Sequence, residues 1–120
     1  MSTHNTTGKT GEALAATYLK EKGYEILHQN WRNSRQEIDI IARHQQLLIF
    51  IEVKTISSTA FGAPENFVDY QKEKHLEKAS LAYIEEEDYR GEIRFDIISV
   101  LFDKHMQAAI QHIEDAFFPY

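Results

Sequence analysis

The sequence contains no cysteine, which excludes disulfide bonds, thiol redox chemistry, thiolate catalysis and cysteine-ligated zinc. No apolar stretch approaches about eighteen residues and no signal peptide is present, so we expect a soluble, cytoplasmic protein without a membrane partner. The histidines show no spacing typical of zinc ligands. With a net charge of −6, the chain also lacks the basic excess of a general nucleic-acid-binding protein. Its 120 residues suffice for one domain with a single core.

Two segments near the middle of the chain predict a β-hairpin. Residues 37–41 alternate between polar and apolar side chains, and residues 47–53 form an apolar, β-branched run typical of a buried strand. Residues 44–46 between them have the composition of a turn. In the natural register of such a hairpin, Asp39 and Glu52 come close together at one end of the sheet.

The alternation of side chains also predicts which residues share a face of this sheet. On the second strand, Glu52 and Lys54 share one face because they lie two residues apart. On the first strand, we expect Ile38 and Ile40 to share the face opposite to Asp39. Lys54 should therefore point into the same space as Glu52.

Asp39 and Glu52 would repel each other at the end of a buried strand, unless a cation lies between them. A divalent ion such as Mg²⁺ is one solution, because it prefers carboxylate and water oxygens. Lys54 could then orient a water molecule or stabilise the charge that develops on a phosphate. The alternative is structural: Glu52 and Lys54 would form a salt bridge at the rim of the sheet.

The remaining elements predict an α/β fold with a mixed central sheet, helices packed on it and the order αβββαβ. We expect a flexible stretch over residues 1–7 and one domain over residues 8–120. A helix should begin at Thr7 or Thr10 and end at Gly23. The other expected elements are a strand over 24–31, a helix from Phe67 to about Glu85, a strand over 93–102 parallel to the central one, and an edge strand with an aromatic plug within 107–118.

Three flanking residues have two interpretations each. Glu12 borders the apolar stripe of the first helix, so it either stabilises the helix start through the dipole or assists the proposed site. Trp31 and Arg32 could stack a base and hold a phosphate, or they could be a core residue and a solvated cation.

Arg94 and Asp96 are two residues apart, and we interpret them mainly as a structural ion pair. The role of Phe61, in the loop after the second strand, stays open.

Several blocks resemble one known family in order along the chain. They are Gly11-Glu12 with Ala15, Asn30-Trp31-Arg32, Glu37-Ile38-Asp39, Phe50-Ile51-Glu52-Val53-Lys54-Thr55, Arg94-Phe95-Asp96 and His112-Ile113-Glu114-Asp115-Ala116-Phe117. Together they resemble the YraN-like family, small bacterial proteins regarded as endonucleases and similar in fold to archaeal Holliday-junction resolvases. Asp39 with Glu52-Val53-Lys54 resembles the signature of the wider restriction-endonuclease-like superfamily. The chain departs from these patterns at Gln36, where the family usually has Gly, and at Ile38, where the superfamily often has Pro.

The resemblance implies a metal-dependent endonuclease acting on DNA, including branched DNA. It implies Mg²⁺ or Mn²⁺ bound by Asp39 and Glu52 with Glu12, and Lys54 as the residue that serves the attacking water. Lys72 of the second helix, then Gln71, and Arg32 are the expected nucleic-acid contacts. A homodimer stays open, as does the rival function of a non-catalytic nucleic-acid-binding or protein-interaction module.

The distribution of acids reduces the objection raised by the net charge. Three acids, Glu12, Asp39 and Glu52, belong to the candidate site, and four form the run Glu85 to Asp88. Without these seven, twelve acids remain against thirteen Lys and Arg. Any contact with nucleic acid should therefore be a local patch.

Overall fold

In the part of the chain that the structure describes, the sheet has five strands in the order in which they occur along the sequence, β1-β2-β3-β4-β5. A computed structural model describes residues 3–57 and 70–116, and within them the side chains of residues 10–56 and 73–116. The elements are α1 (Thr3–Glu21), β1 (Glu25–Asn33), β2 (Gln36–His44), β3 (Leu47–Ser57), α2 (Tyr70–Glu87), β4 (Glu92–Phe102) and β5 (Ala108–Ile113). Strands β3 and β4 are parallel and the other neighbours are antiparallel. The α/β prediction and its αβββαβ order are confirmed, with β5 as the expected edge strand.

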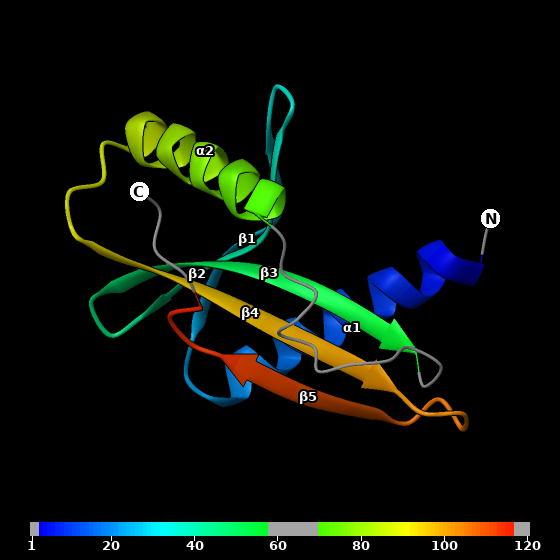
Figure 1. The fold of residues 1–120 in the computed structure, drawn as a ribbon. Coiled ribbons are helices and arrows are strands. Elements are labelled where there is room, and N and C mark those ends of the chain that lie inside the picture. The colour runs from blue at the N-terminus through cyan, green and yellow to red at the C-terminus, as the bar shows by residue number, and fades with distance from the viewer. Residues whose placement is uncertain (1–2, 58–69, 117–120) are drawn as a thin grey trace.

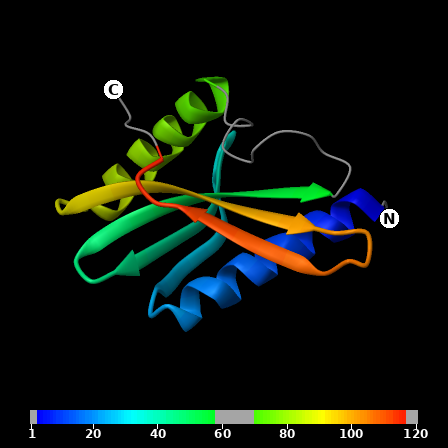
Figure 2. The same ribbon diagram turned by 60° about the horizontal axis from the view of Figure 1, so that its bottom comes forward.

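The two helices cover opposite faces of the sheet (Figures 1 and 2). Helix α1 packs on a buried cluster that includes Ile40, Ile49, Ile51 and Ile98, and α2 packs on a second cluster around Phe50. We refer to these as the α1 face and the α2 face. Among the described helices, neither has the length and apolarity that crossing a membrane requires. The β1–β2 hairpin projects from the sheet on the side of α2 (Figure 1).

Helices α1 and α2 are both followed by a residue in the left-handed conformation, and α1 starts earlier than the sequence predicts. Helix α1 begins at Thr3, earlier than Thr7 or Thr10. It ends at Glu21, and Gly23 just after it has a left-handed φ of 90°, with the Tyr24 N–H donating back to the Leu19 carbonyl at 2.9 Å. Helix α2 closes similarly at Asp88, so the acidic run continues the helix through Glu87 rather than fraying.

The start of the second helix and the tail fall partly outside what the structure describes. The described residues resume at Tyr70, which is the first residue of α2, and the expected start at Phe67 lies outside them. The same is true of Phe61 and of the aromatic residues after Ala116. The described part of the tail, β5, pairs in regular register with β4 from Ile97↔Ile113 to Phe102↔Ala108.

Candidate metal and phosphate site

Asp39 lies where β2 separates from β3. The β2–β3 ladder ends at the pair Ile40↔Ile51, although β1 and β2 remain paired beyond it. Beyond this point a side-chain hydrogen bond takes the place of the backbone pairing: the Asp39 Oδ2 accepts from the Val53 N–H at 2.8 Å. The prediction that Ile38 and Ile40 share a face is wrong, since Ile38 packs on the α2 face and Ile40 on the α1 face. The change of face across Asp39 coincides with the separation of the strands, which turns this carboxylate toward β3.

Glu52 and Lys54 lie on the α2 face, as their alternation with Phe50 predicts. The Lys54 Nζ lies 3.9 Å from the Glu52 Oε1, and the two side chains are 7% and 18% exposed. The second oxygen of Glu52, Oε2, is fully buried. The alternative of a salt bridge at the sheet rim therefore holds only in part, since the pair is present but largely buried. A buried ion pair of this kind is weak grounds for a purely stabilising role, because desolvation offsets the attraction.

Glu12 approaches the same region from the α1 face. Its neighbour Gly11 is buried against β3, and a Cβ at this position would collide with the side chain of Thr55. The missing side chain lets α1 lie close to the second half of β3, which brings Glu12 toward Asp39. Because α1 begins at Thr3, Glu12 lies in the middle of the helix, so the alternative of dipole stabilisation at the helix start is wrong.

The carboxylate of Asp39 is held in an unfavourable environment. Its pKa is raised from an ordinary 3.8 to about 7, mainly by burial and further by the charges of Glu12, Glu52 and Glu37, while the hydrogen bond from Val53 opposes the rise. Of these acids, Glu12 has the largest effect. The site thus concentrates negative charge at Asp39, and a bound cation or a proton would relieve it.

Replacing Glu12 by glutamine is expected to lower the pKa of Asp39 by up to about one unit, because it removes the strongest neighbouring charge while burial persists. A carboxyl ¹³C NMR titration of the metal-free protein measures this shift. Glu21→Gln, an exposed substitution on the same helix, is the control and should leave the Asp39 titration unchanged. If the Asp39 pKa is the same in wild type and in Glu12→Gln, then Glu12 does not belong to the site.

The described side chains contain no group of three or more His, Asp or Glu that could hold a metal ion together. The three candidate acids approach from different sides of the sheet. Glu12 comes from helix α1 on the α1 face, Glu52 shares the α2 face with Phe50, and Asp39 lies at the separation of β2 and β3. Mg²⁺ commonly uses only one or two carboxylates and completes its shell with water and substrate phosphates. Asp39 and Glu52 fit that requirement, and Glu12 contributes charge to the site.

The expected nucleic-acid contacts are only partly described. The side chains of Lys72 and Gln71 lie outside the described side chains, although both residues belong to α2. Trp31 packs edge-to-face on Tyr83 with ring centroids 5.3 Å apart, which supports its interpretation as a core residue. Arg32 at the hairpin tip is exposed, and its Nη2 lies 3.6 Å from Glu37 Oε1.

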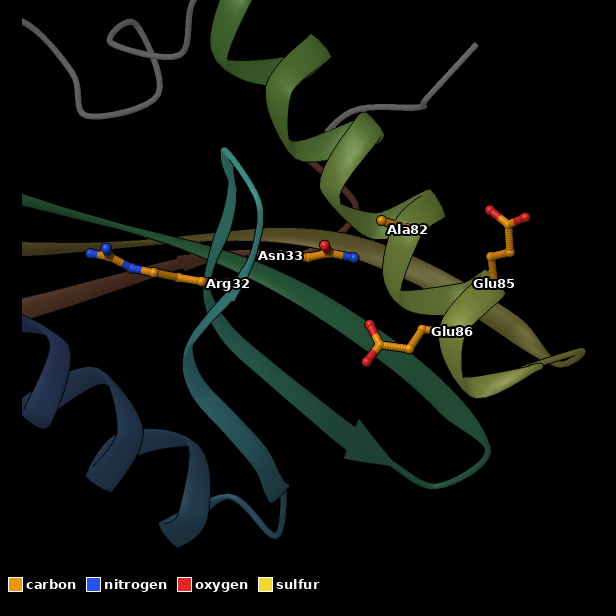
Figure 3. Close-up of a pocket in the computed structure, with 5 residues that line it drawn as sticks. All are labelled: Arg32, Asn33, Ala82, Glu85 and Glu86. Carbon is orange, nitrogen blue, oxygen red and sulfur yellow. The ribbon is translucent and has the colours of Figure 1, made fainter.

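A hollow of about 480 Å³ lies between the hairpin tip and α2, and it is acidic. Its lining residues are Arg32, Asn33, Ala82, Glu85 and Glu86. Figure 3 shows the Arg32 side chain pointing away from both glutamates. Two carboxylates disfavour a phosphate in this hollow, so a phosphate bound by Arg32 would lie on the other side of the hairpin.

A second charged cluster, which the sequence indicated only as an Arg94–Asp96 pair, anchors the tail. Asp96 is fully buried, and its two oxygens accept hydrogen bonds from Arg94 Nε and Nη2, each at 2.8 Å. The Asp115 N–H donates to it at 3.0 Å, and His112 Nε2 lies 2.8 Å from Oδ2. Burial by itself raises the pKa of Asp96, but these hydrogen bonds outweigh it and hold the pKa below its ordinary value.

The outer side of this cluster joins the tail to the end of α1. Arg94 Nη2 donates to the Tyr24 hydroxyl at 2.8 Å and lies 3.0 Å from Glu114 Oε1. The Tyr18 hydroxyl lies 3.2 Å from His112 Nδ1. The cluster lies on the α1 face and is satisfied by its own members, so we assign it a structural role. This agrees with the interpretation of Arg94 and Asp96 as a structural ion pair.

Comparisons with known proteins agree with the resemblance seen in the sequence. The chain is 46% identical over 118 residues to a UPF0102 protein of Flavobacterium psychrophilum and 47% identical over 118 residues to one of Christiangramia forsetii, each alignment covering 98% of both chains. A UPF0102 protein of Thermodesulfovibrio yellowstonii is 45% identical over 111 residues, which cover 92% of this chain and 95% of the relative. The model of the "Uncharacterised protein family UPF0102" matches residues 11–100. The chain therefore belongs to the UPF0102 family, to which the YraN-like resemblance pointed.

Proposed function

We propose that the protein is a metal-dependent endonuclease that hydrolyses phosphodiester bonds in DNA. The observation that carries the proposal is the convergence of Asp39, Glu52 and Lys54 where β2 leaves β3. A fold has no packing reason to gather carboxylates around a buried aspartate whose pKa is raised to about 7 by burial and by their charges. Such perturbed groups are typical of functional sites.

The residues present fit a hard divalent cation. Asp39 and Glu52 would hold Mg²⁺ or Mn²⁺, and the negative charge of Glu12 would strengthen the attraction. When bound, the ion would polarise a phosphate oxygen and make a water molecule more acidic. Asp39 would keep its orientation through the Val53 N–H, which fixes Oδ2.

Lys54 has the properties needed to serve the reacting phosphate. Its ammonium is largely removed from water, so its charge acts in a low-dielectric environment. It can donate up to three hydrogen bonds, to a phosphate oxygen or to the attacking water, and so stabilise the charge that develops in the transition state. Its contact with Glu52 keeps the ammonium on the α2 face.

DNA, including branched DNA, is the substrate that the resemblance to resolvase-like nucleases supports. The projecting β1–β2 hairpin supports contact with an extended ligand, because it presents Arg32 and the exposed Arg35 beyond the sheet, within a few residues of Asp39. Lys72 and Gln71 remain proposed contacts. The rival function, a binding module without catalysis, predicts the same contacts but no cleavage.

Lys54→Met is expected to reduce metal-dependent cleavage by about 10²–10³-fold, the usual loss when a donor to a developing oxyanion is removed. Methionine keeps much of the volume of the buried stem, so the fold should persist. The assay incubates purified protein with linear duplex, single-stranded and four-way-junction DNA, with Mn²⁺, Mg²⁺ or chelator, and follows the products on a denaturing gel.

Lys74→Met is the matched control, since Lys74 also lies near a glutamate, 3.8 Å from Glu77, but on helix α2 and half exposed. It should cleave as wild type does. No cleavage of any substrate by wild type with either ion would favour the binding module. Cleavage by Lys54→Met at the wild-type rate would remove Lys54 from the mechanism.

A further inference from the structure

Ser99 is a polar residue within the apolar second half of β4, residues 97–102. It lies in β4 between Ile98 and Val100 and is fully buried. In the parallel β3–β4 ladder its Cα partner is Lys54. Directly paired residues of neighbouring strands point to the same face, so Ser99 lies on the α2 face beside the stem of Lys54.

The hydroxyl of Ser99 has no hydrogen-bond partner in the part of the chain that the structure describes. This is unusual, because buried hydroxyls are normally paired and an unmade bond is costly. The other buried serine among the described residues, Ser80, follows the rule and donates to the Leu76 carbonyl at 2.7 Å. Ser99 therefore offers a buried acceptor and donor next to the candidate site.

Lys54 has a geometry that allows it to use this hydroxyl. Its Nζ lies 3.9 Å from Glu52 Oε1, which is an ion-pair distance but is longer than the 2.7–3.2 Å of a hydrogen bond. An ammonium group has three donors and a flexible stem, so a small rotation changes its acceptor. When Glu52 binds a cation, the attraction between Glu52 and Lys54 weakens, and the ammonium can turn toward the Ser99 hydroxyl.

We propose that Ser99 is a positioning residue for Lys54, whose ammonium donates to the Ser99 hydroxyl oxygen once Glu52 is engaged by a metal ion. The proposal rests on the proposed nuclease function and deepens it, because Ser99 would keep Lys54 at the reacting phosphate. Ser99 itself would touch neither metal nor DNA.

The test mimics the loss of the Glu52 charge without metal, by combining Ser99→Ala with Glu52→Met in a double-mutant cycle. In the wild-type background, Ser99→Ala should leave the melting temperature unchanged or raise it, because it removes an unpaired hydroxyl. In the Glu52→Met background, it should lower the melting temperature by roughly 3–6 °C, the effect of one buried hydrogen bond in a domain of this size. It should also move the ¹⁵N signal of the Lys54 ammonium in that background alone.

Ser80→Ala is the control: it should lower the melting temperature equally in both backgrounds and leave the Lys54 signal in place. If Glu52→Met does not fold, Glu52→Gln also removes the charge and enters the same cycle. Equal effects of Ser99→Ala in the two backgrounds, with an unmoved Lys54 signal, would overturn the positioning role. The cycle uses neither metal nor DNA, so an absence of cleavage would refute the nuclease separately.

Discussion

Replacing Asp96 by alanine is expected to destabilise the protein by about 3–5 kcal/mol, the usual cost of removing one partner of a buried ion pair. Domains of this kind have a total stability of about 5–15 kcal/mol, so the variant should lose a large part of it. The loss comes from the groups that remain: the Arg94 side chain is only 16% exposed, and among the described residues its guanidinium would keep the Tyr24 hydroxyl and Glu114 as partners. His112 and the Asp115 N–H would also lose their acceptor.

The chain contains a matched control for this substitution. Arg90 and Asp88 are also an arginine and an aspartate two residues apart, with a 3.3 Å contact, but they are 84% and 80% exposed. Asp88→Asn, which removes the charge and suits the left-handed backbone at this position, should therefore change the free energy of unfolding by no more than about 1 kcal/mol. Urea denaturation of both variants and wild type measures the difference. Similar costs for the two substitutions would show that the Asp96 cluster does not anchor the tail.

The pH dependence of stability provides a second check on Asp96. Its pKa in the folded protein is lower than in the unfolded chain, so the folded state favours the ionised carboxylate. The resulting stability is present above the unfolded pKa, about 3.9, and is lost as the pH falls below it. Acid denaturation of wild type should thus include a component that Asp96→Ala lacks.

The order of elements could be predicted because it depends on local patterns. The alternation of Phe50, Glu52 and Lys54 gives the faces of β3, and the run of β4 with the helix before it gives a parallel neighbour. The start of the first helix was predicted less accurately, since α1 begins at Thr3. The residues before Gly8 carry no apolar pattern that would indicate a helix.

The orientation of Asp39 could not be predicted, since it depends on where two strands separate. Regular alternation places Ile38 and Ile40 on one face, but the end of the β2–β3 ladder at Ile40↔Ile51 breaks the alternation. The register itself was predicted, and with it the approach of Asp39 to Glu52. Strand separation is a tertiary feature without a local signal in this chain.

Long-range partners were also missed. Tyr24 and Arg94 are 70 residues apart, and Tyr18 and His112 are 94 apart, so no spacing in the sequence connects them. Ser99 left a weaker signal, a hydroxyl within the apolar run of β4. Interpreting it required the β3–β4 register, which places it beside Lys54.

Asp39→Asn is expected to stabilise the metal-free protein at neutral pH by about 1–3 kcal/mol. Ionised Asp39 is disfavoured because its pKa is raised from 3.8 to about 7, a difference that corresponds to about 4 kcal/mol at most. Relaxation of the surroundings reduces this value. Asparagine is uncharged and keeps a carbonyl oxygen that can accept the Val53 N–H, so the hydrogen bond at the separation of the strands should survive.

The direction of the Asp39 pKa shift determines the pH range over which Asp39→Asn stabilises the protein. Because the folded pKa of Asp39 is raised above the unfolded value, the folded state holds a proton that the unfolded chain has released, and wild type loses stability as the pH rises from about 4 to about 7. The advantage of Asp39→Asn should therefore be absent below about pH 4, grow across this window and stay constant above it. Melting curves in chelator at several pH values follow this difference.

Metal ions provide the deciding comparison for Asp39. Millimolar Mn²⁺ should raise the melting temperature of wild type at pH 7.5, because an ion that binds only the folded state adds stability by RT ln(1 + [L]/Kd). Asp39→Asn should lose most of this increase, since a neutral amide oxygen is a weaker ligand than a carboxylate, while Asp88→Asn, on an exposed aspartate, should retain it. A variant that is less stable than wild type in chelator and still responds fully to Mn²⁺ would make Asp39 a structural hydrogen-bond acceptor. The metal would then have to bind elsewhere.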